Sequence, residues 1–324
     1  MLIDSFGRKI DYLRLSVTDR CDLRCRYCMP EGGIDFSRRD ELLSFEEIST
    51  LSKIFSELGI VRVRLTGGEP FIRKDIMQLI RSIRSYYQSF NITTNATKLH
   101  LHLEELKELE IHGLNISIDS LDADKFKQIT RRDAFDKVIS NIYLAIESGF
   151  KVKLNVVVLR GINDNEILDF VDLTRSLPVT VRFIEAMPFN GSDGNKDQFI
   201  PFTEILAMVE EKYLLKNIDD RAPSSSVEYN IDDHLGKIAV IPAYSRSLCG
   251  SCNRLRLTAK GEILNCLYSN SSLSLKNMLR SGMGASSIKQ SILDHIMLKR
   301  KSGFDEENQR SNKDFFEPMT TIGG

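Results

Sequence analysis

Three cysteines near the N-terminus are the residues of this chain best suited to chemistry. Cys21, Cys25 and Cys28 have the spacing C-x₃-C-x₂-C, and Tyr27 precedes the last of them. Three thiolates can hold three corners of a [4Fe–4S] cube and leave the fourth iron open to a ligand that is not protein. Structural zinc is the main alternative, but it takes four ligands and the sequence places no histidine nearby. We therefore expect a [4Fe–4S] cluster here rather than zinc or three unconnected thiols.

A second group of three cysteines lies far along the chain. Cys249, Cys252 and Cys266 have the spacing C-x₂-C-x₁₃-C. A zinc ribbon would supply a second C-x₂-C pair, which the sequence lacks. Two interpretations therefore remain open for this group. It could hold a structural zinc with a distant fourth ligand, or a second cluster whose open iron binds a substrate directly.

Two arginines lie between the cysteines of this second group. Arg254 and Arg256 alternate with Leu255 and Leu257, and in a strand this alternation places both arginines on one face. The guanidinium fork matches the oxygens of a polyphosphate or a carboxylate. A solvated strand face is the alternative, and the neighbouring cysteines favour the ligand.

Length and composition narrow the class of protein. The chain has 324 residues, a net charge of −1 and 42% hydrophobic residues, which is ordinary for a globular protein. The balanced charge argues against a nucleic-acid partner. No apolar run approaches the roughly 20 residues of a membrane span, and residues 1–20 are too charged for a signal peptide. We expect a cytoplasmic protein with neither membrane nor nucleic acid as a partner.

The elements that must position the cysteines alternate between strands and helices up to about residue 215. One helix begins after Ser44, which forms a capping box with Glu47, and ends at Gly59. Another is expected from about Asp133 to Gly149. Such alternation predicts a parallel sheet with right-handed crossovers. The expected strands are Tyr12–Val17, Val61–Thr66, Asn91–Thr94, Leu114–Ile118, Val152–Leu159 and Val179–Ile184.

Polar and glycine-rich segments fall in or just after these strands. They are Gly67–Pro70, Thr93–Asn95, Ser117 with Asp119, and Arg182–Met187. Parallel α/β folds place their sites at the carboxyl ends of strands, so these segments should converge with the first cysteine group. Lys153 interrupts a strand that otherwise reads as buried, and an inward lysine needs an anionic partner from the protein or a ligand.

The pattern changes after residue 215. Residues 221–236 are expected to form a loop. Lys237–Ile241, Arg254–Thr258 and Ile263–Leu267 are expected to be short antiparallel strands, and the last sixty residues mostly helical. We therefore divide the chain into residues 1–215 and residues 216–324.

The first cysteine group resembles the signature of the radical S-adenosylmethionine (SAM) superfamily. The aromatic Tyr27 before the last cysteine belongs to that signature, and Gly67–Pro70 (Gly-Gly-Glu-Pro) resembles the superfamily's second motif. The resemblance implies that SAM chelates the open iron. It also implies that one electron from the cluster cleaves SAM to methionine and a 5′-deoxyadenosyl radical.

Within the superfamily the whole chain resembles the GTP 3′,8-cyclases of molybdenum cofactor biosynthesis. The resemblance extends from the segment that ends at Cys21, through Thr93–Asn95 and Gly161–Asp164, to the final Ile-Gly-Gly. It implies a partial (β/α)₆ TIM-type barrel with a C-terminal α+β region that carries a second [4Fe–4S] cluster and closes the barrel mouth. The segments around 216–236 and 280–312 contribute little to it.

This resemblance also implies a mechanism and a set of site residues. The radical would abstract hydrogen from C3′ of GTP, and the C3′ radical would add to C8 of a guanine held at the second cluster. SAM would be contacted by Tyr27, Gly68, Ser117 and Met187. GTP would be contacted by Arg14, Arg64, Thr93, Lys153, Arg254 and Arg256, with Arg182 as a further candidate. The Gly323–Gly324 tail would reach into the active site.

The implied partners and the rival functions complete the expectations. A flavodoxin-type or ferredoxin-type protein would donate the electron, and cyclic pyranopterin monophosphate synthase would take over the product. Homodimerisation is left open. One rival is a radical SAM enzyme that modifies a peptide with the help of an auxiliary cluster. The other is a metal-binding or redox protein without catalysis, which leaves Gly67–Pro70 and the interior arginines unexplained.

Overall fold

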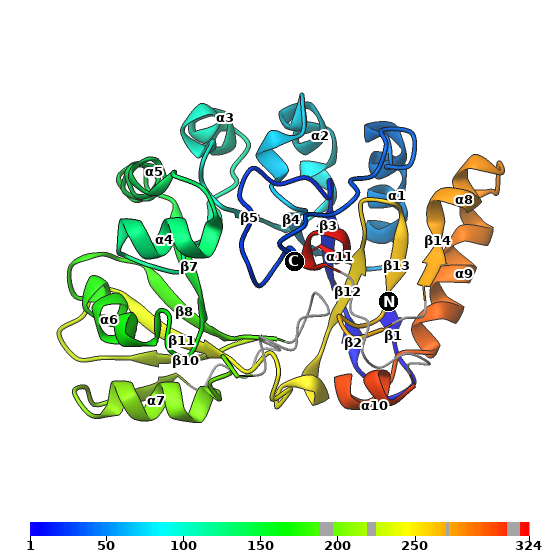
Figure 1. The fold of residues 1–324 in the computed structure, drawn as a ribbon. Helices are drawn as coiled ribbons and strands as arrows, with labels where there is room; N and C mark the ends of the chain where they lie inside the picture. The colour runs from blue at the N-terminus through cyan, green and yellow to red at the C-terminus, as the bar shows by residue number, and fades with distance from the viewer. Residues whose placement is uncertain (188–196, 219–224, 270–271, 310–317, 324) are drawn as a thin grey trace.

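The protein is built around one curved, mostly parallel sheet. The computed structural model describes residues 1–187, 197–218, 225–269, 272–309 and 318–323. Within them twelve strands form a sheet in the order β14-β13-β12-β3-β4-β5-β6-β7-β8-β11-β10-β9. The short strands β1 (Leu2–Ile3) and β2 (Lys9–Ile10) form a separate antiparallel pair. Figure 1 shows that the sheet is curved and that helices lie along its outer side.

The centre of the sheet consists of the six predicted strands. They are β3 (Tyr12–Ser16), β4 (Arg62–Thr66), β5 (Ser89–Thr94), β6 (Gly113–Ser117), β7 (Lys151–Val158) and β8 (Thr180–Glu185). Each pairs in parallel with the next one in sequence. The prediction of a partial TIM-type barrel is therefore confirmed.

Helices connect these strands and cover the outer face. They are α1 (Phe45–Glu57), α2 (Ile76–Ile83), α3 (Leu103–Glu108), α4 (Ala123–Thr130), α5 (Phe135–Glu147), α6 (Ile167–Ser176) and α7 (Phe202–Glu210). The predicted capping box is present, because Ser44 Oγ accepts from the Glu47 amide and Glu47 Oε2 accepts from the Ser44 amide. No helix in the described residues is long and apolar enough to cross a membrane.

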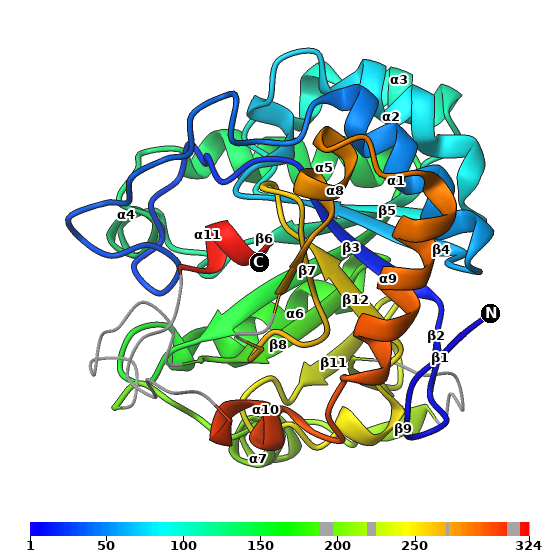
Figure 2. The same cartoon turned by 90° about the vertical axis from the view of Figure 1, so that its right-hand side faces the viewer.

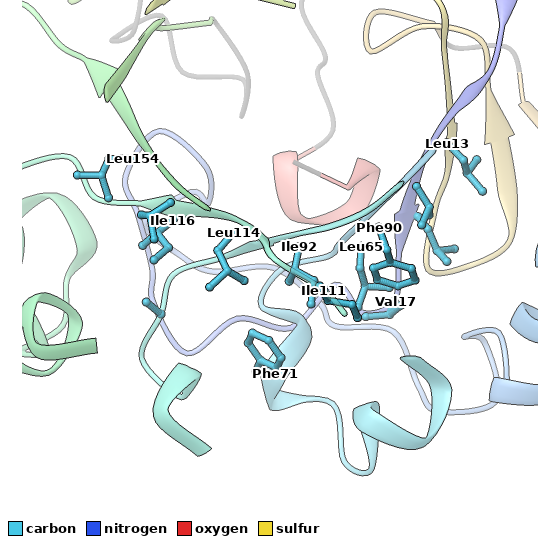
Figure 3. Close-up of a cluster of buried hydrophobic side chains, with 14 of the residues drawn as sticks. Leu13, Val17, Leu65, Phe71, Phe90, Ile92, Ile111, Leu114, Ile116 and Leu154 are labelled. Atoms are coloured by element: carbon cyan, nitrogen blue, oxygen red, sulfur yellow. The ribbon is translucent and has the colours of Figure 1, made fainter. Parts of the chain in front are cut away.

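The two faces of the central strands differ in chemistry. Leu13, Leu65, Ile92, Leu114 and Leu154 are at most 1% exposed. They lie on the side of the sheet away from α11 (Met319–Ile322), as Figure 3 shows. Each such side chain contributes about 1.5–3 kcal/mol by leaving water. Because side chains alternate along a strand, their neighbours line the interior, and many of those are polar or cationic.

The C-terminal part of the chain extends both edges of this sheet. Its strands are β9 (Lys216–Ile218), β10 (Val227–Asn230), β11 (Lys237–Ile241), β12 (Arg254–Leu257), β13 (Glu262–Leu264) and β14 (Ser272–Ser274). β11 adds in parallel to β8, and β12 adds in parallel to β3. Parallel pairing therefore continues without a break from β12 to β11.

Two expectations for this region were wrong. Residues 221–236 are not all loop, because Val227–Asn230 forms β10 between β9 and β11; residues 221–224 lie outside the described residues. The antiparallel pairing of β12 with β13 is as expected, but the antiparallel pairing of β11 with β10 is not, and β11 and β12 each also join the barrel in parallel. Strand periodicity does not specify the neighbour, which long-range packing selects. The division at residue 215 remains a prediction.

The end of the chain is helical and returns to the interior. Its helices are α8 (Leu275–Arg280), α9 (Ala285–Met297), α10 (Gly303–Asn308) and α11. α8 and α9 lie beside the β13–β14 edge, and α11 lies on the inner side of the sheet in both views (Figures 1 and 2). Gly323 has φ of 78°, where glycine is favoured. Gly324 lies outside the described residues.

Candidate active site

All six cysteines line one cavity of about 350 Å³ inside the curved sheet. The first group comes from the loop after β3, and the second comes from the segment around β12 and β13. The cavity is also lined by most of the other residues singled out from the sequence, namely Arg14, Tyr27, Arg64, Gly68, Thr93, Ser117, Arg182, Met187, Arg254 and Arg256. Lys153 is absent from this lining.

The first cysteine group, Cys21, Cys25 and Cys28, lies in an apolar and acidic setting. Burial is the main cause that raises the pKa of all three thiols, to about 12 for Cys28, and nearby Asp119 adds to it for Cys25 and Cys28. The backbone of Thr320 and the side chain of Asn95 hydrogen-bond to Cys28 and Cys21. Cations bound there would deprotonate such thiols, as iron does in a cluster.

A buried pair fixes the aromatic residue of this loop. The Tyr27 hydroxyl donates to Asp119 Oδ2 at 2.7 Å, and Asp119 Oδ1 accepts from the Val157 amide at 2.8 Å. Burial raises the pKa of the Asp119 carboxyl to about 6. Asp119 therefore ties the cysteine loop to the ends of β6 and β7. The sequence placed Asp119 at the site but did not reveal this role.

The glycines after β4 are required by a close crossing of two loops. A Cβ on Gly68 would lie 2.1 Å from the Arg20 carbonyl oxygen, and one on Gly67 would lie 2.6 Å from that of Thr18. The Gly68 and Glu69 amides donate to the same two carbonyls. Gly68 also lines the cavity, so a SAM contact is compatible with this packing role.

Five arginines from four strands face the cavity without a protein anion. None of Arg14, Arg64, Arg182, Arg254 and Arg256 forms an ion pair with another described residue. Burial lowers the pKa of Arg14, Arg182 and Arg256, and the charges of neighbouring arginines lower it further. The pKa falls to about 9 for Arg182 and to about 10 for Arg256. The Nε atoms of Arg14, Arg64 and Arg182 are buried without a hydrogen-bond partner. Such a set fits a polyanionic ligand.

Two buried oxygen atoms, one on β5 and one on β7, also lack a hydrogen-bond partner among the described residues. Thr93 Oγ1 and Asn155 Oδ1 are buried and accept no hydrogen bond, although both residues line the cavity. Thr93 had been predicted to contact the ligand. Asn155 had not, although it is the polar inward residue between Leu154 and Val156 in β7.

Lys153 forms an ion pair with a carboxylate of the protein and does not line the cavity. Its Nζ lies 3.1 Å from Glu228 Oε1, on β10, which is the second strand from the edge of the sheet. The sequence allowed either a protein or a ligand anion for this lysine, and the structure supplies the protein anion. Its contact with GTP stays a prediction.

The second cysteine group lies in a cationic setting. Burial alone raises the pKa of the Cys252 thiol, but the charges of Lys299, Arg254 and Arg8 outweigh it and lower the pKa to about 7. The Gly303 amide donates to Cys249 Sγ at 3.4 Å, and Arg8 donates to the Cys249 carbonyl at 3.0 Å.

Two buried residues whose roles the sequence did not reveal hold this segment. Glu185, at the end of β8, accepts from the amides of Phe202, Tyr244 and Ser245. Arg246 stacks on the ring of Tyr268 at 3.8 Å and on that of Phe304 at 4.2 Å. The partners of these two residues come from distant parts of the chain, so only the fold identifies their roles.

The six cysteines are available as ligands. All six are free of disulfides. No three His, Cys, Asp or Glu side chains of the described segments surround one point as ligands of a single ion would. The corners of an iron–sulfur cube lie on separate irons, so its thiolates stand farther apart than zinc ligands do.

Comparison with known proteins agrees with this geometry. Residues 15–174 match the Radical SAM superfamily model, and residues 179–304 match that of Molybdenum Cofactor Synthesis C. The chain is 41% identical over its full length to GTP 3′,8-cyclase, mitochondrial, of Arabidopsis thaliana, covering 84% of that protein. It is 42% identical to GTP 3′,8-cyclase of Syntrophomonas wolfei, with both chains fully covered.

Other relatives differ in length or share only the fold. The chain spans about half the length of several animal relatives that it matches at similar identity. The structure of Streptococcus suis SuiB bound to the precursor peptide SuiA aligns with 97% of this chain and 76% of that one. Its TM-score is 0.63 at 14% identity, so it supports the fold alone. By its matching models and its full-length relatives, the chain belongs to the radical SAM superfamily and, within it, to the GTP 3′,8-cyclase family.

Proposed function

We propose that this chain converts GTP into (8S)-3′,8-cyclo-7,8-dihydroguanosine 5′-triphosphate, the first step of molybdenum cofactor biosynthesis, with SAM and two [4Fe–4S] clusters. One observation carries the proposal: the same cavity is lined by two cysteine groups and by five arginines that form no ion pair with any described residue. With SAM bound, the first cluster would supply a 5′-deoxyadenosyl radical to that cavity.

The first loop provides the SAM side of the cavity. Cys21, Cys25 and Cys28 would hold three irons and leave the fourth to SAM. Tyr27, fixed by Asp119, would orient SAM together with Gly68, Ser117 and Met187. These residues come from the ends of β3, β4, β6 and β8, which is where barrel enzymes assemble their sites.

The arginines provide the substrate side. A nucleoside triphosphate carries about four negative charges at neutral pH, and it would relieve the repulsion among Arg14, Arg64 and Arg256. Thr93 and Arg254 lie in the same lining. Cys249, Cys252 and Cys266 would hold the second cluster near the guanine base. The triphosphate would thus be bound by arginines of the barrel and of β12, and the base by the second cluster.

The proposal extends to the partners of the reaction. A low-potential donor of the flavodoxin or ferredoxin type would reduce the first cluster, and cyclic pyranopterin monophosphate synthase would receive the product. A cytoplasmic location is proposed as well.

A peptide-modifying radical SAM enzyme is the second candidate. The fold shared with SuiB favours it, because that structure holds a precursor peptide. The buried arginines argue against it, since an ordinary peptide supplies no cluster of negative charge to match them.

Anaerobic reconstitution with iron and sulfide tests the proposal. We expect about eight irons per chain, from two four-iron clusters, and release of 5′-deoxyadenosine that depends on GTP. ATP in place of GTP is the matched control and should give no cyclised product. Stoichiometric zinc without SAM cleavage would refute the proposal, and turnover of a peptide but not of GTP would support the second candidate.

A further inference from the structure

Lys299 buries its ammonium group beside the second cysteine group. The residue lies just beyond the end of α9 and is only 3% exposed. Its Nζ donates to the carbonyl oxygen of Arg254 at 3.1 Å and to that of Asn265, the residue directly before Cys266. No carboxylate of the described residues forms an ion pair with it.

This arrangement leaves a buried charge without a protein counter-ion. Carbonyl oxygens satisfy the hydrogen-bonding capacity of an ammonium group but do not neutralise its charge, and burial of an unpaired charge is costly. The groups that feel its field are the thiols of Cys252 and Cys266 and the ring of His295. Glu306 acts on Cys266 with the opposite sign, but its carboxylate accepts from the Arg300 amide.

An iron–sulfur cluster held by the three cysteines would supply the negative charge that pairs with Lys299. A [4Fe–4S] core of charge 2+ bound by three thiolates has a net charge of −1, which becomes −2 on reduction. A fixed positive charge beside it therefore stabilises the reduced form more than the oxidised form. Carboxylates lie around the first cysteine group instead, since Asn95 donates to both Cys21 Sγ and Asp22, and the Tyr27 hydroxyl donates to Asp119.

We propose that Lys299 is the countercharge of the second cysteine group, a positioning residue that holds the reduction potential of the second cluster above that of the first. The inference rests on the proposed function, because it requires the second cluster. It adds a residue that touches neither substrate nor SAM and acts only through the charge balance of the cluster.

Redox titration of the full-length chain, followed by electron paramagnetic resonance, tests this role. The second cluster is isolated by replacing Cys21, Cys25 and Cys28 with Ala, and Lys299→Gln and Lys299→Arg are compared in that background. Glutamine keeps a donor for the two carbonyls without the charge, whereas arginine keeps the charge. We expect Lys299→Gln to shift the midpoint to more negative potential and Lys299→Arg to restore it. The first cluster, isolated by replacing the other three cysteines, should not shift.

Each other outcome is decisive. An unchanged midpoint in Lys299→Gln with normal iron content overturns the inference, because the lysine would then be a structural donor only. If Lys299→Gln folds, as thermal unfolding of the iron-free chain reports, but binds no second cluster while Lys299→Arg does, the charge is required and the inference stands. Loss of the cluster from both folded variants overturns it. If the parent chain itself holds only about four irons, the proposed function fails first.

Discussion

The two cysteine groups have the same number of thiols but opposite surroundings. The first lies in the loop after β3, where burial and the acidic residues Glu69 and Asp119 oppose thiolate formation. The second lies along β12 and β13, where Lys299 and Arg254 favour the thiolate of Cys252, although burial still raises the pKa of Cys266. The difference suits two tasks. A cluster in acidic surroundings is a strong reductant, whereas a cluster among cations can sit beside an anionic nucleotide.

The largest effects are expected when one cysteine is removed from each group, because SAM cleavage and GTP cyclisation should then be lost separately. Cys25→Ala removes an iron ligand, so SAM cleavage should fall by more than about 100-fold. Cys252→Ala should retain part of the uncoupled SAM cleavage but lose the cyclised product. Both activities are measured as 5′-deoxyadenosine and product by chromatography. Full cyclisation by both variants would show that the roles are assigned wrongly.

Removal of a cavity arginine should come next and act on the substrate alone. Arg256→Met deletes a buried charge, and GTP binding should weaken by about 2–3 kcal/mol, or roughly 30- to 150-fold in Kd. Arg256→Lys should be weakened less, because it keeps the charge but not the fork. Equilibrium binding of GTP to reconstituted protein measures both. The exposed Arg39→Met is the matched control, and an equal effect there would deny Arg256 a specific role.

Disruption of the Tyr27–Asp119 pair should have a smaller effect on the SAM side. Asp119→Asn weakens a charge-assisted hydrogen bond, so the KM for SAM should rise roughly tenfold at normal iron content. Tyr27→Phe removes the same bond, and the double variant should be no worse than either single one. Additive effects would mean that the two side chains act separately.

The smallest effect is expected at Lys153 on β7. Variants of this residue and its partner test whether the proposed GTP-binding surface extends to that strand. Its ion pair with Glu228 is partly exposed and is worth at most about 1 kcal/mol. Glu228→Gln should free the lysine and tighten GTP binding by up to about fivefold, whereas Lys153→Ala should weaken it by a similar factor. If neither variant changes the Kd for GTP, Lys153 only links β7 to β10 through Glu228 and does not contact GTP.

Much of the fold was predictable because it is local. The six central strands and the capped α1 follow from periodicity and from side-chain capping, which neighbouring residues determine. The placement of β11 and β12 in parallel at both edges of the barrel was not predictable. It depends on contacts between residues such as Arg256 and Arg14, which are far apart in the chain.

The sequence by itself determined which residues could serve as iron ligands, by type and spacing, and which strands carry arginines on one face. The tertiary structure alone decided that both cysteine groups share a cavity, that Lys153 has a partner in Glu228, and that Asp119 and Lys299 support opposite ends of the site. The physical reason is that spacing reports on neighbours in the chain. The charge and solvation around a side chain are set by elements that only folding brings together.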